Sequence, residues 1–306
     1  MNIMTEDKEK QLTVFFENGP VSNADDFTPQ IPDASQFYCD AMNDEIINSV
    51  LNDVKPELIV LIGFADYGKS TFVGSLYQYL MNVGGAEGYH LYDSDTYSGF
   101  ERRFYLRNIK NDENTKSKIL RTDEDDGYML TLNFYHPSSR EKKQIVISDR
   151  PGETYKKYVD TKMVIQKDQS LPRAQRVLLF VDSVQMCEEW DVLQEKFRLL
   201  FTGLKENSKM PNDAAYDIIF NKIDLVNSDP AKRVIFERIK SNVVSFFESQ
   251  LNSDAVIGVV ELDSKHVHNN NSFIKYIGNL LKKDETLKNK ETRLKKNLDW
   301  VNELLK

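Results

Sequence analysis

Apolar positions recur along the chain on two different periods, and together they predict a sheet covered by helices. Short apolar runs, typical of buried strands, lie at 58–62, 177–182, 216–220 and 255–262. Segments with the apolar spacing of a helix follow them, at 70–82, 184–202, 230–251 and 272–283. Because strands and helices alternate, the pattern favours a largely parallel sheet with helices on both faces. The predicted fold class is α/β.

The pattern also predicts how the chain is organised. Residues 1–55 have little periodic signal and are expected to form an N-terminal arm with one short helix at 44–53. Residues 56–283 form the expected main domain, with an insertion near 84–125. Residues 284–306 form a predicted C-terminal helical extension.

Three smaller elements are expected inside the main domain. The stretch 127–149 predicts a β-hairpin, and 98–107 predicts a helix within the insertion. Ser228 is expected to cap the helix that follows it, with Pro230 in the first turn.

Apolar residues from Phe273 to Leu305 fall on the a and d positions of a heptad, with two interruptions. One interpretation is a continuous helix that pairs with a helix of a partner protein. The other is a helix folded back onto its own domain, and the pattern leaves both open. The basic residues of this tail suit a solvated helix face.

Composition excludes several classes of function. The 306 residues carry a net charge of −8, which argues against nucleic acid as the main partner. No stretch resembles a signal peptide or a membrane span, so no membrane partner is expected. The two cysteines, Cys39 and Cys187, lack metal-ligand spacing, and reduced thiols agree with the expected cytoplasmic location.

The first apolar run ends in a glycine-bounded loop, GFADYGKS, at 63–70. A loop of the form G-x-x-x-x-G-K-[ST] between a strand and a helix is typical of phosphate binding, because its N–H groups cradle a di- or triphosphate. Lys69 is expected to reach the β- and γ-phosphates, and the Ser70 hydroxyl is expected to ligate Mg²⁺. An ordinary glycine turn is the alternative. The residues expected to contact nucleotide here are Gly63, Asp66, Tyr67, Gly68, Lys69, Ser70 and Thr71.

Two later motifs also follow apolar strands. DRPG at 149–152 fits D-x-x-G, in which Asp149 holds the Mg²⁺ shell and the Gly152 N–H meets the γ-phosphate, although an ordinary turn also has this composition. NKID at 221–224 fits N-K-x-D. The Asp224 carboxylate can accept two hydrogen bonds from guanine, whereas adenine would leave it unpaired. Asn221 is expected to hold this loop, and the stem of Lys222 is expected to cover the purine ring.

With GFADYGKS, DRPG and NKID in this order, residues 56–283 resemble the Ras-like and translation-factor (TRAFAC) class of P-loop GTPases. The strings SDTYSGFERR, RT and DRPGE also resemble a bacterial double-GTPase group from conflict or defence cassettes. The resemblance implies a G domain that binds GTP or GDP with Mg²⁺. It also implies a base contact after the last strand, at Ser264 and Lys265, where Asp-Ser-Lys replaces the usual Ser-Ala-Lys.

The resemblance also requires a threonine that ligates Mg²⁺ and senses the γ-phosphate. Thr122 is expected to do so, because it is the nearest threonine before the predicted strand 128–135. Thr96 is the alternative. In either case the competing interpretation is a hydroxyl that caps or closes a turn.

Glu153 follows D-x-x-G, where the family often has Gln or His, and it is expected to position the attacking water. Its negative charge beside a phosphate implies slow turnover. Arg121 is the candidate arginine finger. The alternatives are Arg102, Arg103 and Arg150, and for all four a surface ion pair with a neighbouring carboxylate is the simpler interpretation.

These features predict a GTPase that converts GTP to GDP and phosphate and acts as a switch in a bacterial, defence-related assembly. The expected partners are guanine nucleotide and protein, either another GTPase or a second copy of the chain. Two other functions stay open: a GTP-binding scaffold that does not hydrolyse, and an ATP-using P-loop enzyme. N-K-I-D argues against the last.

Overall fold

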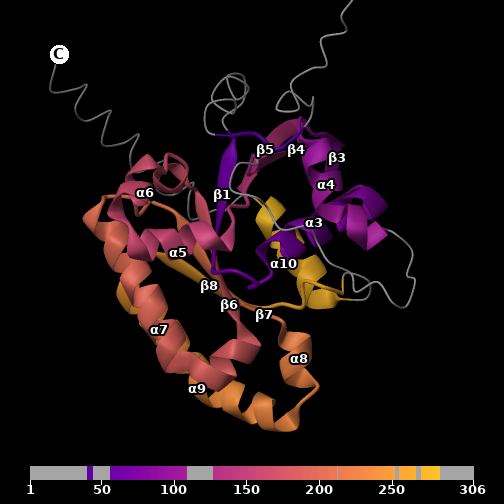
Figure 1. Ribbon diagram of the computed structural model, residues 1–306. Helices are drawn as coiled ribbons and strands as arrows, with labels where there is room; N and C mark the ends of the chain where they lie inside the picture. The colour runs from indigo at the N-terminus through magenta and orange to yellow at the C-terminus, as the bar shows by residue number, and fades with distance from the viewer. Residues whose placement is uncertain are drawn as a thin grey trace, which may run out of the picture. The chain divides into compact units, whose positions relative to one another are not determined.

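The computed structural model describes residues 40–43, 56–108, 127–211, 213–251, 255–266 and 270–282, all within one unit of the chain. In this described part, eight strands form one sheet in the order β2-β3-β4-β5-β1-β6-β7-β8 (Figure 1). Neighbouring strands in the part β5-β1-β6-β7-β8 pair in parallel. Neighbouring strands in the part β2-β3-β4-β5 pair antiparallel. Their bounds are β1 Glu57–Ile62, β2 Gly85–Ala86, β3 Tyr89–Asp93, β4 Met129–His136, β5 Glu141–Ser148, β6 Arg176–Asp182, β7 Ala215–Asn221 and β8 Val256–Glu261.

The central strands are apolar along their length because helices cover both of their faces. Every residue of β6 and β7 is buried, and so are the last four residues of β1. The parallel strands all end at the same edge of the sheet, and the three motif loops follow β1, β5 and β7 there. The predicted α/β fold is confirmed.

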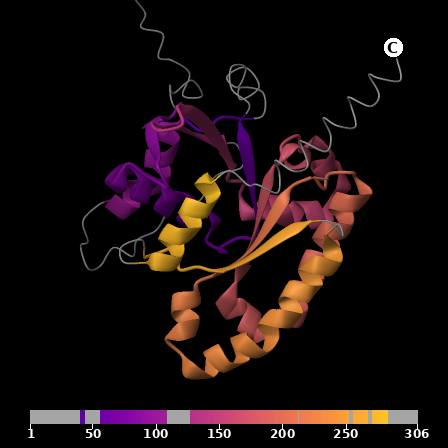
Figure 2. The same ribbon diagram turned by 180° about the vertical axis from the view of Figure 1, so that it is seen from behind.

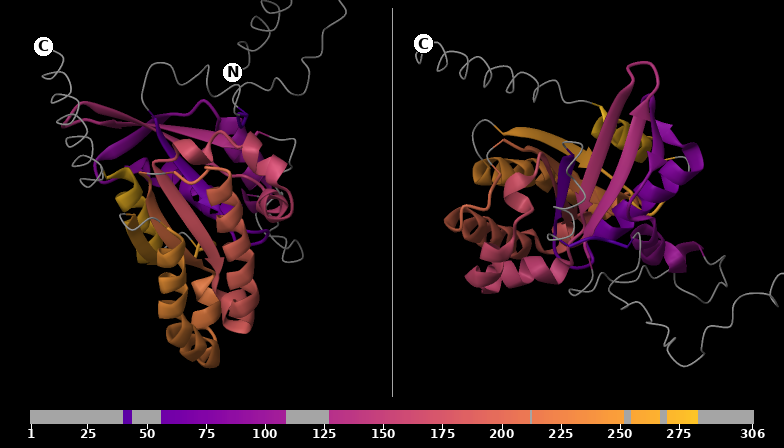
Figure 3. Two further views of the ribbon diagram at one scale, coloured as in Figure 1. Left: turned by 90° about the vertical axis from the view of Figure 1, so that its left-hand side faces the viewer. Right: turned by 90° about the horizontal axis from the view of Figure 1, so that it is seen from above.

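Two groups of helices lie on opposite faces of this sheet (Figures 1 and 2). On one face α3 packs against α10, where Phe72 lies 5.8 Å from Phe273 between ring centres. On the other face α5, α7 and α9 pack together, and Phe197 of α7 lies 5.1 Å from Phe247 of α9. Figure 3 shows α7 and α9 side by side. The helices are α3 Lys69–Val83, α4 Tyr97–Asn108, α5 Gly152–Asp160, α6 Lys162–Lys167, α7 Ser183–Glu206, α8 Ile223–Asn227, α9 Pro230–Gln250 and α10 Asn271–Leu281, with the 3-10 turn η2 at Leu171–Arg173.

Two helix ends differ from the prediction. Asp229, not Ser228, caps α9, because its carboxylate accepts hydrogen bonds from the N–H groups of Ala231 and Lys232. The Ser228 hydroxyl instead donates to the carbonyl of Leu225. At the other end of the domain α10 stops at Leu281, since Lys282 is extended.

A short segment ahead of β1 joins the sheet. Met42 forms an antiparallel bridge with Met129, and main-chain hydrogen bonds of 2.9 Å link the two residues in both directions. The predicted helix at 44–53, the rest of the arm before residue 40, and the tail after residue 282 lie outside the described residues. The insertion contains α4, as predicted, and also β2 and β3, which were not predicted. No helix in the described part is long and apolar enough to cross a membrane.

Candidate functional site

The loop between β1 and α3 closes around the Lys69 side chain. Its ammonium donates hydrogen bonds to the carbonyl oxygens of Gly63, at 2.6 Å, and Phe64, at 3.1 Å. These bonds turn the loop carbonyls inward onto the lysine and place its charge at the N-terminus of α3. Free N–H groups and the helix dipole favour an anion at such an end.

Three of the predicted acidic residues surround this lysine. Burial lowers the pKa of Lys69 to about 8, while the carboxylates of Asp149, Glu153 and Asp66 act in the opposite direction. Asp66 is exposed in the loop with a φ of 65°, and Glu153 is exposed in the first turn of α5. Since negative groups outnumber the ammonium here, a bound polyphosphate needs a further cation.

Two glycines let distant segments touch the loop. Gly68 has a φ of 85°, and a Cβ there would lie 2.1 Å from Nδ2 of Asn221. A Cβ at Gly152 would lie 2.2 Å from the main-chain nitrogen of Ala65. The D-x-x-G segment and the N-K-x-D segment therefore both pack directly against the phosphate loop.

The predicted metal ligands Ser70 and Asp149 lie together. The Ser70 hydroxyl donates to Oδ1 of Asp149 at 3.2 Å, and Asp149 is fully buried. A hydroxyl and a carboxylate are hard oxygen donors, the kind that Mg²⁺ prefers. The residues present therefore fit a Mg²⁺ ion.

The other carboxylate oxygen of Asp149 contacts Arg103 from α4. Arg103 Nε lies 3.3 Å from Oδ2 of Asp149, and the arginine side chain is only 4% exposed. The expected ion pair of Arg103 with a carboxylate is thus present, but it is buried and not at the surface. Its burial depends on how α4 docks, and the sequence of α4 carries no signal that singles out this arginine from Arg102.

Tyr155 is a site residue that sequence reasoning missed. Its hydroxyl donates to the carbonyl of Leu61 at 2.5 Å, and its ring centre lies 5.6 Å from Nζ of Lys69. The ring is fully buried and lies one turn beyond Gly152 on α5. It forms an aromatic wall beside the lysine.

Asn221 connects the phosphate loop to the loop after β8. Its Nδ2 donates to the carbonyl of Tyr67 at 2.9 Å, and its Oδ1 accepts from the Ser264 hydroxyl at 2.8 Å and the Ser264 N–H at 3.3 Å. Tyr67 itself is buried against Phe64 and Phe197. Three segments far apart in sequence therefore meet at one amide.

The remaining N-K-x-D residues stand at the start of α8. Lys222 has a φ of 61°, and its ammonium lies 2.6 Å from Oδ2 of Asp182 at the end of β6. Asp182 also caps α7 through Oδ1. This pair anchors the lysine, while Asp224 remains half-buried in the first turn of α8.

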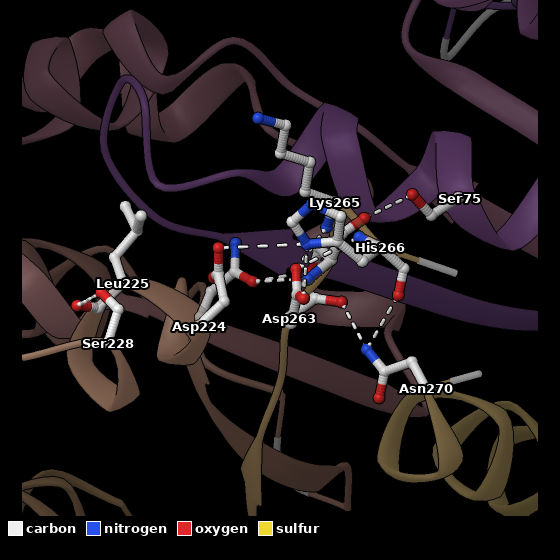
Figure 4. A network of polar contacts seen from close by, with 10 residues as sticks. Ser75, Asp224, Leu225, Ser228, Asp263, Lys265, His266 and Asn270 are labelled. Atoms are coloured by element: carbon white, nitrogen blue, oxygen red, sulfur yellow. Dashed lines mark hydrogen bonds and ion pairs between the residues drawn. The ribbon is translucent and has the colours of Figure 1, made fainter. Parts of the chain in front are cut away.

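Asp224 has two neighbours that the motif did not predict, Asp263 and His266 (Figure 4). Nδ1 of His266 lies 2.7 Å from Asp263 and 4.0 Å from Asp224. Asp263 also accepts hydrogen bonds from the N–H groups of Lys265 and His266, which closes the turn. Figure 4 shows the Lys265 side chain extending away from this group. The Ser75 hydroxyl of α3 donates to the carbonyl of Ser264 and so links the same loop to α3.

Some predicted residues are not part of the described site. Thr122, Arg121 and the side chain of Arg102 lie outside the described residues. Thr96, the alternative metal ligand, is fully buried and its Oγ1 accepts the N–H of Thr131 at 2.8 Å. This hydroxyl ties the turn between β3 and α4 to β4. Thr71, by contrast, follows Ser70 in the first turn of α3 and is half-buried, and its contact with nucleotide stays a prediction.

Arg150, the second residue of D-x-x-G, contacts Tyr128 and Asp168. Its guanidinium stacks 3.9 Å above the ring of Tyr128 and lies 3.1 Å from Oδ1 of Asp168. Its side chain is 11% exposed, so here too the expected ion pair is present but is not at the surface. Arg150 joins a buried network behind α5.

The sequence from residue 57 to 279 matches the family model for Double-GTPase 2. The chain belongs to the Double-GTPase 2 family. The match covers the whole sheet together with the loops that follow β1, β5 and β7, so the chain is a P-loop GTPase of the double-GTPase type. No curated protein shows significant sequence similarity to this Double-GTPase 2 chain.

Solved GTPase structures are similar to this Double-GTPase 2 protein at low sequence identity. One is the Methanosarcina barkeri Roco2 RocCORdC protein bound to GDP, at 16% identity and a TM-score of 0.37, covering 74% of this chain and 48% of that one. Another is the S. cerevisiae Ski7 GTPase-like domain bound to GTP, at 13% identity and a TM-score of 0.41, covering 79% and 54%. The chain spans about half the length of these two proteins.

Proposed function

We propose that this Double-GTPase 2 protein binds GTP with Mg²⁺, hydrolyses it to GDP and phosphate, and works as a nucleotide-dependent switch. The observation that carries the proposal is the Asn221 amide, which joins Tyr67 in the phosphate loop to Ser264 in the loop after β8. One nucleotide then spans the two loops, with its phosphates at Lys69 and its base at Asp224.

In this proposal each loop recognises one part of the nucleotide. The Lys69 ammonium and the N–H groups at the start of α3 bind the β- and γ-phosphates. The Asp224 carboxylate accepts hydrogen bonds from guanine N1–H and the exocyclic amine, which adenine does not offer. Ser264 and Lys265 supply main-chain contacts to the base, and the Lys222 stem covers its ring.

Ser70 and Asp149 would hold the Mg²⁺ ion, and Thr122 is proposed as a further ligand from its place in the sequence. A bound Mg²⁺ ion supplies positive charge at the phosphate oxygens. The fit rests on the two oxygen donors 3.2 Å apart and on the carboxylates around Lys69.

Glu153 is proposed to orient the attacking water, because it is exposed at the start of α5 and acts electrostatically on Lys69. A carboxylate accepts a hydrogen bond from that water but adds negative charge next to the γ-phosphate. Intrinsic turnover is therefore slow until a cation compensates. Arg121 is the proposed source of that cation.

The switch part of the proposal rests on Gly152. It packs directly on Ala65 of the phosphate loop and is also the first residue of α5, so a γ-phosphate at this contact acts on the start of the helix. A protein partner, either another GTPase or a second copy, would recognise the resulting order of residues 152–158 in a bacterial assembly. The arm at 1–55 and the tail at 284–306 are proposed as the parts outside the G domain.

A GTP-binding scaffold that does not hydrolyse is the second candidate, favoured by the charge of Glu153 beside Lys69. It differs from the first in one measurable quantity, the phosphate released from a bound nucleotide.

The test is to incubate the full chain with Mg²⁺ and either GTP or ATP, and to measure bound nucleotide and released phosphate. Lys69→Ala and Asp224→Asn are the controls. The proposal expects GTP-selective binding, loss of all binding in Lys69→Ala, and loss of guanine binding in Asp224→Asn. Binding without phosphate release favours the scaffold. Equal or preferential use of ATP overturns the guanine site.

A further inference from the structure

Arg103 links three separate segments of the chain beside Asp149, one of the proposed Mg²⁺ ligands. Its Nε contacts Asp149, its Nη1 donates to the carbonyl of Gly99 at 3.0 Å, and its Nη2 donates to the carbonyl of Gly127 at 2.9 Å. The acceptors belong to D-x-x-G, to α4 and to the residue that leads toward β4. A planar guanidinium with donors on three sides suits such a junction.

Arg103 compensates the negative charge of Asp149. This carboxylate is fully buried, and a buried carboxylate requires a cation or several donors around it. Arg103 supplies a cation and Ser70 supplies a hydroxyl. Under the proposed function the same carboxylate also belongs to the Mg²⁺ shell. Arg103 contacts Oδ2 and the Ser70 side of the site faces Oδ1, so the two cations would share the charge of one carboxylate, and each would weaken the attraction of the other.

We propose that Arg103 is a positioning residue that competes with Mg²⁺ for Asp149, so that binding of Mg²⁺ and nucleotide releases α4. The inference rests on the proposed function and deepens it, because it assigns the moving part to α4. When the arginine leaves the carboxylate, the link from α4 to D-x-x-G is lost.

The residues around the Arg103 contacts explain why breaking them would affect more than one side chain. A Cβ at Gly99 would lie 2.5 Å from the nitrogen of Ala41, and one at Gly127 would lie 1.8 Å from the oxygen of Ala41. Both carbonyl partners of Arg103 thus come from glycines that pack on the segment ahead of β1. That segment in turn pairs with β4 through Met42. Opening the junction is expected to loosen α4 and residues 40–43 together.

The first test is the Mg²⁺ concentration that gives half-maximal binding of a fluorescent GDP analogue to the full chain. Arg103→Gln is expected to lower this concentration about tenfold, the scale of one charge-assisted hydrogen bond. Arg103→Lys keeps the cation and is expected to restore most of the original requirement. An unchanged or higher Mg²⁺ requirement in Arg103→Gln overturns the inference.

Arg176→Gln is the matched control, because Arg176 is also a buried arginine and pairs with Asp217, near the start of β6 and at the sheet edge opposite the three motif loops. It is expected to lower stability and to leave the Mg²⁺ requirement as in the parent chain. An equal shift in both variants overturns the competition, because the effect then follows from a weakened fold.

Hydrogen exchange on the parent chain gives a readout that needs no variant to fold. Amide exchange in 97–103 and 40–43 is expected to rise severalfold on addition of Mg²⁺ and GDP, against the general protection expected elsewhere. Slower exchange in both segments overturns the release of α4. A chain that binds no guanine nucleotide at any Mg²⁺ concentration instead contradicts the proposed function, so the two failures are distinguishable.

Discussion

The Asn221 side chain donates a hydrogen bond of 2.9 Å to the main-chain oxygen of Tyr67, and this bond links the ends of two strands that are not neighbours. Asn221 ends β7, Tyr67 lies in the loop after β1, and β6 runs between the two strands. One amide therefore ties the phosphate loop to the N-K-x-D segment and, through Ser264, to the loop after β8.

Replacing Asn221 by alanine is expected to weaken guanine-nucleotide binding about tenfold or more. The change leaves the Tyr67 carbonyl and the Ser264 hydroxyl without this partner, which also costs about 1–3 kcal/mol of stability. Equilibrium binding and urea denaturation measure the two effects. Ser264→Ala is the comparison, because it removes one of the bonds but keeps the link to Tyr67. Equal losses in the two variants would contradict the importance of that link.

The buried Lys69 predicts a dependence of nucleotide affinity on pH. Its pKa is about 8 in the folded chain, and bound phosphates raise it, so above pH 8 binding takes up a proton. The dissociation constant is expected to rise by up to about tenfold per pH unit above 8. Fluorescence titrations between pH 7 and 9.5 measure this, and a flat affinity over that range would rule out the lowered pKa.

The same lysine has a separate effect on the stability of the chain without nucleotide. Between about pH 8 and 10.5 the unfolded chain holds a proton on Lys69 that the folded chain has lost, so stability rises with pH in this window. Lys69→Met is the control and is expected to abolish both this rise and nucleotide binding.

The positions of the motif loops were predictable because each motif follows an apolar strand. The apolar runs 58–62 and 216–220 and the hairpin at 127–149 indicated strands, and parallel strands bring their carboxyl ends to one edge. That rule alone places Lys69, Asp149 and Asn221 on the same edge. The antiparallel strands β2 and β3 escaped prediction because β2 has only two residues and β3 carries exposed polar positions.

The contacts that complete the site were not predictable, since each depends on the packing of elements far apart in sequence. The amino-acid sequence of α4 does not indicate that Arg103 is buried against Asp149. The sequence before β1 does not indicate that Met42 pairs with Met129. The prediction of the α9 cap was wrong for a more local reason. Ser228 and Asp229 both suit an N-cap, and the backbone conformation selects the second.

Glu153 is expected to act on turnover and not on binding. Glu153→Ala removes the acceptor for the attacking water and is expected to lower phosphate release on the order of 10²-fold, with nucleotide affinity retained. Glu153→Gln keeps a side chain that orients water without the negative charge, so it is expected to turn over at least as fast as the parent chain. Single-turnover hydrolysis decides this, and parent-rate hydrolysis by Glu153→Ala would remove the water-positioning role.

Asp263, in the loop after β8, predicts different effects for its replacement by alanine and by asparagine. Its Oδ1 holds the N–H groups of Lys265 and His266 at 3.0 and 3.2 Å. Asp263→Ala removes both bonds and is expected to weaken guanine binding about fivefold to tenfold, the effect of roughly one net hydrogen bond. Asp263→Asn keeps the acceptor oxygen and is expected to bind nearly as the parent does. Equal weakening in both would mean that the carboxylate charge, and not the turn, is what matters.

Behind α5, Asp168 is the centre of a buried polar network. Its Oδ1 faces the Arg150 guanidinium at 3.1 Å, and its Oδ2 accepts from the Tyr158 hydroxyl at 2.7 Å. Burial acts to raise the pKa of Asp168, but Arg150 and the hydrogen bonds outweigh burial and hold the pKa below 3.8. The Asp168 carbonyl also accepts from Lys209 beyond α7.

Arg150→Gln is therefore expected to destabilise the chain by about 3 kcal/mol at pH 7, because it leaves a buried carboxylate without its cation. The sign of the pH dependence follows from the lowered pKa. Asp168 contributes stability that is fully present above pH 3.8 and is lost as the pH falls through its folded-state value. The difference in stability between the parent chain and Arg150→Gln is thus expected to shrink as the pH falls below the ordinary aspartate pKa. Urea denaturation at pH 7 and near pH 3 measures this, with Asp168→Asn as the control that lacks the charge throughout, and a constant difference between parent and variant would show that the ion pair is not its source.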